Sequence, residues 1–469
     1  MAFIVLVVLW CVVFATWWWI RPRPVGKAVN TPPMYPGALP LIGHSHRFIG
    51  DLTSKSFIEL YHECLSKDGI VNYHVLFVLV LTDPDDCLLI SNTCLKKPNI
   101  YNFGRKLFGN GLVTADTSTW KLHRKLLHPA FNVKILHSFI EEYNKLARNF
   151  VDRLACKVGK DPFNVKSYIY ESILNSACRF SIGNNEDYNH ILKEYITVVE
   201  HFFELVFTRF QRVWLHPEII FNWSSLKKIE DKLVKRIKLH TIPHNISVIN
   251  ITEFISETKH KPILDQLLEL GDQGFFTDAE IREHMDTILV AAFDTTGTSM
   301  TFTLILIGSH PDVQARIYDE DLSKEDLNKL VYLEAVIKES LRLYPPTPRI
   351  ARSSFSDLKL RHYTLPANST YIISMYGINR HPMWGPDANQ FKPERWLDPT
   401  TLPQNPSAFS SFSLGKRNCI VFAMLVAKTI LAHVIRRYRI SSDITKMKTS
   451  CDLILKPVEG HLISLQLRT

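Results

Sequence analysis

The alternation of apolar and polar residues predicts a body built mostly from helices. Residues 54–69 place apolar side chains three or four positions apart and stop at Gly69, which is typical of an amphipathic helix. Residues 70–84 instead alternate and are rich in β-branched residues, which predicts a β-hairpin. Helical spacing dominates from Ser118 to about Leu239, and residues 352–374 alternate again. The pattern therefore predicts a mainly α fold with a small β portion.

Three further helices are expected toward the C-terminus. Residues 278–308 are polar at first and apolar on all sides later, so the second half should be buried, with Asp278 as the cap. Residues 326–346 form a helical pattern that ends at two prolines, and residues 419–440 predict a final helix.

The N-terminal segment, Ala2 to Ile20, carries no charge and ends in three tryptophans. As a helix it would extend roughly 28 Å, about the thickness of a bilayer core. A cleaved signal peptide is the alternative, but no basic region precedes the segment and no A-x-A site follows it. Arg21 and Arg23 follow the span, so the positive-inside rule places the body on the cytosolic side.

We therefore expect a transmembrane anchor at 1–20, a linker at 21–45 and a single catalytic domain at 46–469. The linker contains six prolines between Arg21 and His44, which block helix and stiffen the chain.

Charge and cysteine content narrow the function classes. The formal net charge is +9, which suits an anionic membrane surface or an acidic protein partner. Without a block of Lys and Arg or a nucleic-acid motif, no nucleic-acid partner is expected. The eight cysteines are scattered without CxxC pairs, which argues against a disulfide framework or a structural zinc site.

Cys419 lies in the stretch SFSLGKRNCIVFAML, just before an apolar run. A helix N-terminus and the neighbouring Lys416 and Arg417 would favour a thiolate, and Gly415 would let the loop approach a flat cofactor. Free cysteines are more often buried packing residues. On this stretch alone, a metal-binding thiolate and a packing cysteine are equally good interpretations.

Two polar groups inside expected helices are further candidates. Asp294 and Thr295 lie within an apolar helix, where a threonine can bond back to an i−4 carbonyl and a carboxyl group can relay protons. The alternative is a polar patch satisfied by its neighbours. Trp120 and Arg124 are four residues apart on one helix face, which suits an anionic ligand group or, equally, an amphipathic surface helix.

A possible ion-pair lock involves Glu339 and Arg342, three residues apart in ESLR, with Arg395 of FKPERW as a second cation. Taken by itself, this motif is more often a solvated helix pair.

The order of these motifs is more specific than any one of them. W-x-x-x-R, D-T-T, E-x-x-R, P-E-R-W and F-x-x-G-x-R-x-C follow one another in a chain that resembles the cytochrome P450 family. The resemblance covers nearly the whole chain. The stretches WKLHRKLLHPAF, HPDVQ and YLEAVIKESLRLYPP are most similar to the microsomal clan that contains the fatty-acid ω-hydroxylases, with insect members as the nearest match.

The resemblance implies a cytochrome P450 fold and a haem b whose iron is ligated by Cys419. Phe412 would shield the sulfur and Gly415 would shape the loop. The haem propionates would be held by Trp120, Arg124, Arg352 and Arg417. Asp294 and Thr295 would deliver protons to iron-bound dioxygen, and the structural triad would consist of Glu339, Arg342 and Arg395.

The implied activity is monooxygenation, in which one oxygen atom enters a lipophilic small molecule. Electrons would come from NADPH through a flavoprotein reductase, with cytochrome b5 as a second candidate donor. The reductase would dock on basic residues near the cysteine, namely Lys121, Lys125, Lys416, Lys428, Arg436 and Arg437. The implied location is the endoplasmic reticulum membrane, crossed once, with a cytosolic catalytic domain. A haem-thiolate isomerase or dehydratase is a weaker possibility, because the Asp294–Thr295 pair suits dioxygen chemistry.

The chain departs from the family pattern at specific positions. Ala291 replaces a glutamate that esterifies the haem in many ω-hydroxylases, and Ala292 replaces a usual glycine. The segment after Glu320 is shorter than in relatives. After Ile420 the chain lacks two residues relative to C-I-G-Q-K-F-A-M, which would rotate the following helix by roughly 200°. The alternative hypothesis is therefore a haem-deficient, inactive relative.

Overall fold

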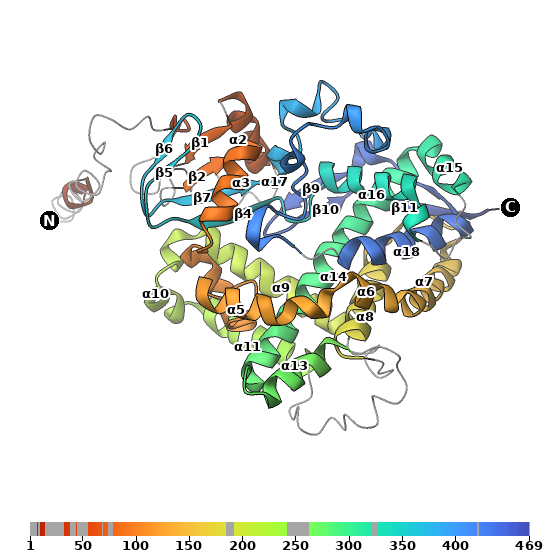
Figure 1. Cartoon of the computed structure of the whole chain (residues 1–469), viewed down its shortest axis with the longest axis horizontal. Helices are drawn as coiled ribbons and strands as arrows, with labels where there is room; N and C mark the ends of the chain where they lie inside the picture. The colour runs from red at the N-terminus through yellow and green to blue at the C-terminus, as the bar shows by residue number, and fades with distance from the viewer. Residues whose placement is uncertain are drawn as a thin grey trace.

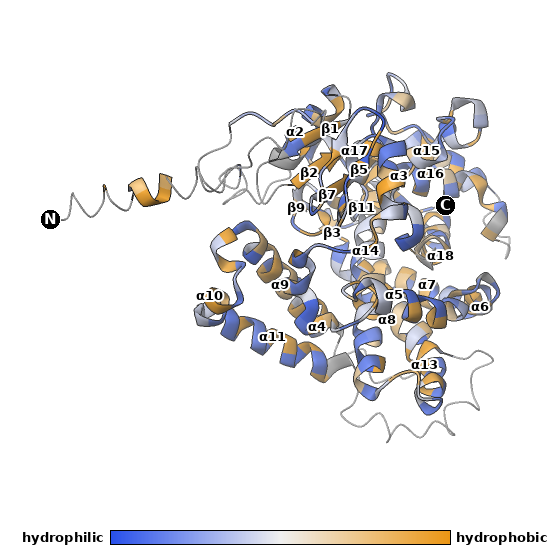
Figure 2. Ribbon diagram, turned by 60° about the vertical axis from the view of Figure 1, so that its left-hand side comes forward, coloured by the Kyte–Doolittle hydropathy of each residue, from blue (hydrophilic) through white to orange (hydrophobic). Residues whose placement is uncertain are grey.

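The computed structural model describes residues 7, 10–14, 32–37, 44, 55–67, 69–73, 78–183, 192–241, 262–320, 327–419 and 422–468. Most of the expected anchor and linker lies outside these residues. Residues 10–14 form an apolar helical turn, orange in Figure 2, with Trp10 67% exposed. The anchor span and the domain boundaries therefore stay predictions.

The body is mainly helical with a small β portion, as the sequence pattern predicts (Figure 1). Its helices are α2 Lys55–Ser66, α3 Pro84–Thr93, α4 Arg105–Phe108, α5 Thr117–Leu127, α6 Val133–Ser138, α7 Ile140–Leu154, α8 Lys166–Ser181, α9 Leu192–Gln211, α10 Glu218–Trp223, α11 Ser225–Thr241, α13 Ile263–Asp272, α14 Asp278–Ser309, α15 Pro311–Asp319, α16 Val331–Leu343, α17 Met375–Ile378 and α18 Phe422–Arg437.

The strands form small sheets. They are β1 Ile70–Tyr73, β2 Val78–Leu81, β3 Phe163–Asn164, β4 Arg349–Ser353, β5 Leu358–Lys359, β6 Thr364–Leu365, β7 Thr370–Ser374, β8 Tyr438–Ser441, β9 Lys448–Cys451, β10 Leu455–Glu459 and β11 Leu462–Leu467. The predicted hairpin is β1–β2, and the largest sheet has the order β1-β2-β7-β4, in which only β2 and β7 are parallel. The strands β8 to β11 near the C-terminus were not predicted.

Helix α14 crosses the centre of the molecule and contacts α8, α16 and α18 (Figure 1). Its second half is buried, as predicted. Thr277 caps it, not Asp278, because Thr277 and Glu280 form a reciprocal capping box. Gly297 allows α8 to approach closely, since a Cβ there would lie 2.7 Å from the Tyr170 ring. Among the described helices α14 alone is apolar and long enough to cross a membrane, but 78% of its apolar window is buried inside the molecule.

The prediction of the last helix, residues 419–440, extends too far at its C-terminal end. Helix α18 stops at Arg437, and residues 438–441 form β8, which pairs with β11. Tyr438 and Ile440 are buried while Arg439 and Ser441 are exposed, so a two-residue period replaces the helical one. The helical spacing of the preceding residues continues to Tyr438, so the sequence pattern alone did not reveal the start of the strand.

A buried ionic cluster fastens α16 to the segment around Arg395. Glu339 and Arg342 are 0% exposed and Arg395 is 3% exposed. Arg342 donates two hydrogen bonds of 2.8 Å to the Glu339 carboxylate, and Arg395 Nε donates one of 2.9 Å. Trp396 Nε1 and the Lys392 backbone N–H donate to the same carboxylate. The buried negative charge is thus fully compensated, as a buried charge must be.

The same cluster extends toward the loop that carries Cys419. Arg342 Nη1 donates to the carbonyl of Asn379, 2.9 Å away. The Asn379 side chain accepts from the backbone N–H of Ser410 at 3.0 Å and donates to the hydroxyl of Ser411 at 2.8 Å. The loop is therefore anchored through Asn379 to the buried arginine.

Substituting Glu339→Gln should lower the free energy of unfolding by about 3–5 kcal/mol, because two buried guanidiniums lose their counter-charge. Urea unfolding followed by circular dichroism measures the effect. Lys338→Gln on the same helix is the control, because its ion pair with Glu334 is one-third exposed and should contribute less than about 1 kcal/mol. A Glu339→Gln effect as small as that of the control would contradict the role of the cluster as a lock.

Candidate functional site

Cys419 lines a cavity of about 320 Å³ beside helix α14. One wall is α14, and the others come from α5, β4, the first turns of α18 and the loop before Cys419. Most of the remaining lining is apolar, including Leu112, Val113 and Phe412. The Cys419 side chain is exposed into this largely apolar cavity and not packed in the core, which favours the ligand interpretation over simple packing.

The loop that presents Cys419 is a tight structure of its own. Ser413 and Gly415 adopt positive φ angles of 68° and 66°, and the backbone N–H of Cys419 donates to the carbonyl of Phe412 at 2.8 Å. A Cβ on Gly415 would lie 2.8 Å from Ser91 and from the side chain of Asn92, both on α3. Gly415 is therefore required for packing the loop against α3, a different reason from the expected approach to a cofactor.

Positive charge converges on the cavity. Arg124 of α5, Arg352 of β4 and Arg417 of the loop line it, as expected for residues that hold an anionic group, and Trp120 packs beneath Arg417 at 4.5 Å. Arg352 Nε and two nitrogens of Arg417 are buried without a hydrogen-bond partner. No Asp or Glu is found among the described residues that line this cavity. The guanidiniums are thus placed to bind an anion that the protein does not supply.

The pKa shifts follow from this crowding of cations. Burial, together with the neighbouring charge of Arg352, lowers the pKa of Arg417 to about 10. Burial also lowers the pKa of Arg352 and of Arg124, although the proximity of Cys419 opposes the shift of Arg124. An anionic ligand would relieve the repulsion among these groups.

Lys97 is a fourth cation that the sequence analysis missed. The backbone N–H of Ser353 donates to the carbonyl of Lys96, which extends the sheet past β4 and turns Lys97 toward the cavity. Burial and the charges of Arg352 and Arg417 lower the pKa of Lys97 well below its usual value. The sequence offered no motif at this position, because the contact depends on a short bridge outside the named strands.

The α14 wall contains the expected polar pair, but its two members face different ways. Thr295 lines the cavity, and its hydroxyl donates to the Ala291 carbonyl at 2.8 Å, the predicted i−4 bond. Asp294 is 1% exposed and does not line the cavity; its Oδ2 lies 3.6 Å from Lys456 Nζ on β10. Any proton passed between them must therefore move around the helix surface by about 100°, the angle between adjacent side chains.

Two of the expected departures fall partly outside the described residues. The shortened segment after Ile420 falls on Ile420 and Val421, which the structure does not describe. The shortened segment after Glu320 falls on residues 321–326, which are likewise outside the described residues. Beyond Val421, Ala423, Met424 and Ala427 line the cavity, so the first turns of α18 contribute to the site.

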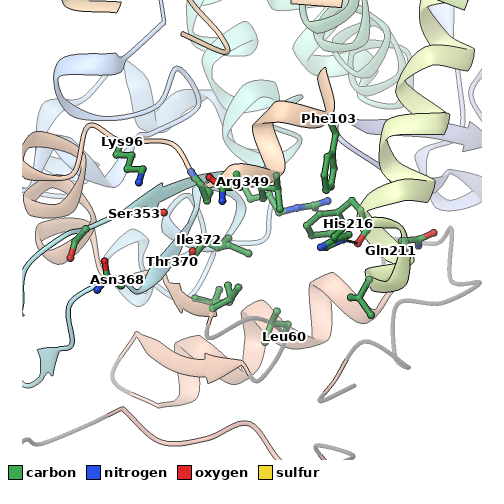
Figure 3. A pocket seen from close by; sticks show the side chains of 18 of the residues that line it. Leu60, Lys96, Phe103, Gln211, His216, Arg349, Ser353, Asn368, Thr370 and Ile372 are labelled. Atoms are coloured by element: carbon green, nitrogen blue, oxygen red, sulfur yellow. Dashed lines mark hydrogen bonds between the residues drawn. The ribbon is translucent and has the colours of Figure 1, made fainter. Parts of the chain in front are cut away.

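A second cavity of about 530 Å³ lies on the other face of the largest sheet (Figure 3). Arg349 and Ser353 of β4 line this outer cavity, whereas Ile350 and Arg352 line the Cys419 cavity. Alternate residues of a strand point to opposite faces, so β4 forms a wall of both. Figure 3 shows Lys96, Ser353 and Asn368 on one side of the outer cavity and Phe103 and His216 on the other.

The proposed basic docking residues are not all available. Lys121, Lys125, Lys416, Arg436 and Arg437 are exposed. Lys428 is 6% exposed, forms an ion pair with Glu334 and donates to the Leu327 carbonyl, so its inclusion was wrong. Its place on the inner face of α18 explains the error, because the charge alone did not show which face it occupied.

Two buried histidines join α5 to α14 next to the cationic residues. His284 Nε2 and His123 Nδ1 are hydrogen-bonded at 3.0 Å, and the Phe276 ring packs edge-on against both rings. Burial, together with the adjacent His123, lowers the pKa of His284 to about 4, and burial lowers the pKa of His123 as well. The pair is therefore neutral near pH 7 and fixes the helix that carries Trp120 and Arg124.

Comparisons with known proteins agree with this geometry. The family model for cytochrome P450 matches residues 36–464. Cytochrome P450 4V2 of Mus musculus is 30% identical over 472 residues, which cover 92% of this chain and 89% of that protein. Cytochrome P450 4c3 of Drosophila melanogaster is 28% identical over 427 residues, covering 82% and 79%.

A solved structure shares the fold. The crystal structure of a cytochrome P450, CYP102L1, superposes with a TM-score of 0.76 at 22% identity and covers 94% of this chain and 100% of that one. At this identity the likeness concerns the fold alone.

Stability should fall as the pH drops from about 6.5 toward 4, because the unfolded state then binds a proton that folded His284 refuses. The contribution of His284 is about 3 kcal/mol across this window. The variant His284→Gln should lose this part of the slope when urea unfolding is measured at several pH values. The exposed His128→Gln is the control and should keep the slope; an unchanged slope in His284→Gln would show that His284 titrates normally.

Proposed function

The chain belongs to the cytochrome P450 family and is a haem-thiolate monooxygenase, and we propose that Cys419 is its axial ligand and that the residues of the surrounding cavity hold the haem. When bound, the haem supplies the activation of dioxygen, whereby one oxygen atom enters the substrate and the other is reduced to water with electrons from NADPH through a reductase. The protein binds the haem, orients the substrate and supplies protons.

The observation that carries the site assignment is the pairing of one cysteine with unpaired cations in a single cavity. Arg352 and Arg417 present buried N–H groups that lack partners, Arg124 adds charge at the same cavity, and the Lys97 amine lines it as well. Two propionates are the anions that a haem would bring, and charge-assisted bonds from guanidiniums suit them. Phe412 lines the cavity as well, where it would cover the sulfur.

The α14 wall would supply protons at the cofactor. The Thr295 hydroxyl faces the cavity, and Asp294 lies one residue earlier inside the protein. A hydroxyl is both a donor and an acceptor, so Thr295 can pass a proton inward while its own bond to Ala291 reforms. Asp294 would be the group that replenishes it.

Lipophilic substrates would enter through the outer cavity of Figure 3. Leu60, Val80, Phe103, Phe210 and Ile372 give it an apolar lining beside Lys96 and Arg349. Ala291 cannot form the ester to the haem expected of many ω-hydroxylases, so the position of oxidation is not fixed by such a link.

The remaining assignments concern location and partners. The apolar segment 2–20 with its following arginines suits a single membrane span in the endoplasmic reticulum, with the catalytic domain in the cytosol. The exposed Lys121, Lys125 and Lys416 would receive an acidic flavoprotein reductase, or cytochrome b5, by electrostatic steering. The comparisons give no support to the alternative of an inactive relative.

Reduced, carbon-monoxide-bound protein should show a thiolate-type Soret band, because Cys419 is the ligand that donates charge to the iron. Cys419→Ala should abolish this band. Cys156→Ala, which changes an exposed cysteine elsewhere, should keep it. A neutral-thiol band in the unaltered chain, or a thiolate band that persists in Cys419→Ala, would overturn the ligand assignment.

Substituting Arg417→Leu should accelerate haem loss to apomyoglobin by about tenfold or more, because a charge-assisted hydrogen bond contributes roughly 1.5–3 kcal/mol. The adjacent, exposed Lys416→Gln is the matched control and should not change the rate. Equal rates in the two variants would show that Arg417 does not bind the cofactor.

A further inference from the structure

The Asp294 carboxyl group is buried in an unusual way. It is 1% exposed, and neither oxygen accepts a hydrogen bond from any residue that the structure describes. A carboxylate in such a place is stable only when a cation or several donors compensate for its lost hydration. Lys456 provides that cation, with Nζ 3.6 Å from Asp294 Oδ2.

Lys456 reaches Asp294 from a different part of the chain. It lies on β10, which contacts α14, and its side chain is only 12% exposed. A lysine buried to this degree needs a counter-charge for the same reason that Asp294 does. Each group therefore supplies the counter-charge that the other needs in order to be buried.

Other charged groups act on the pair from neighbouring elements. The pKa of Asp294 is raised, mainly because the group is buried and also because Asp452 and Glu200 carry like charges. The positive charges of Lys456 and, to a smaller extent, Lys166 oppose this rise. Burial lowers the pKa of Lys456, but the charges of Asp294, Asp452 and Glu200 outweigh it and raise the pKa. Lys456 is thus the main influence that keeps Asp294 ionised.

Two of these groups line a cavity that, among the residues the structure describes, shares no lining residue with the cavity of Cys419. Lys166, Tyr170 and Glu200 line a cavity of about 520 Å³ between α8 and α9. Glu200 forms an ion pair with Lys166 at 2.7 Å, and the Tyr170 hydroxyl is hydrogen-bonded to Thr298, one turn after Asp294, at 2.7 Å. Lys193, on the rim of this cavity, is 78% exposed, so the cavity communicates with the surface.

We propose that Lys456 is a positioning residue for proton delivery, which holds Asp294 as a carboxylate that accepts protons from the Lys166–Glu200 cavity and passes them toward Thr295. Each transfer leaves Asp294 charged again, so the ion pair with Lys456 reforms after every proton. This inference rests on the proposed role of Asp294 in the reaction.

The first test measures the protonation of Asp294 directly. The infrared C=O stretch of its protonated carboxyl group is isolated as the difference between the holoenzyme and the Asp294→Asn variant over a pH series. In Lys456→Met the midpoint should move to higher pH, because burial then acts without its opposing cation. Lys456→Arg should restore it.

The matched control is Lys448→Gln on the adjacent strand β9, whose 70% exposed side chain pairs with Glu459. It should leave the midpoint unchanged. An unmoved midpoint in Lys456→Met would overturn the proposal. Glu200→Gln should move the midpoint to lower pH, and this shift together with Lys456→Arg decides the question if Lys456→Met does not fold. No shift in Glu200→Gln overturns the route through the Lys166–Glu200 cavity.

The second test asks whether the charge matters for turnover. In the enzyme reconstituted with a reductase, the ratio of NADPH oxidation rates in H₂O and D₂O should at least double in Lys456→Met and return in Lys456→Arg. A purely structural lysine would not change this ratio, and an unchanged ratio overturns proton delivery. If Asp294→Asn also leaves the ratio unchanged, the role of Asp294 itself fails, while the infrared shift still tests its coupling to Lys456.

Discussion

The arrangement of the site depends on a single buried carboxylate. Glu339 accepts hydrogen bonds from Arg342, Arg395 and Trp396 in a region with no access to water. The guanidinium of Arg342 then continues through Asn379 to the loop that carries Cys419. Since an uncompensated charge is expensive inside a protein, the cluster tolerates one arrangement only. The loop inherits this rigidity, which a thiolate ligand requires if it is to hold its distance from a metal.

The sequence predicted most of what lies within single helices. The spacing of residues 278–308 located α14. The three-residue spacing of Glu339 and Arg342 alone favoured a solvated pair, and it was the resemblance to the family that predicted the buried cluster with Arg395. The order of the motifs then brought Arg352, Arg417 and Cys419 to one site.

What the sequence could not predict depends on contacts between distant segments. Lys97 is placed by a bridge to β4, and Lys428 is buried because α18 turns that side inward. The direction of Asp294 also follows from packing, because adjacent residues of a helix point about 100° apart and only the neighbouring elements decide which one meets the cavity. None of these outcomes has a local signature.

The two faces of β4 have a consequence for how the family can diversify. Arg349 and Ser353 border the outer cavity, and Ile350 and Arg352 border the inner one, within a strand of five residues. A substitution at Arg349 or Ser353 therefore alters the outer cavity, while Ile350 and Arg352 keep lining the cavity of Cys419. Because one short strand presents separate residues to each cavity, the shape of the outer cavity can change without replacing a residue that lines the cavity of Cys419.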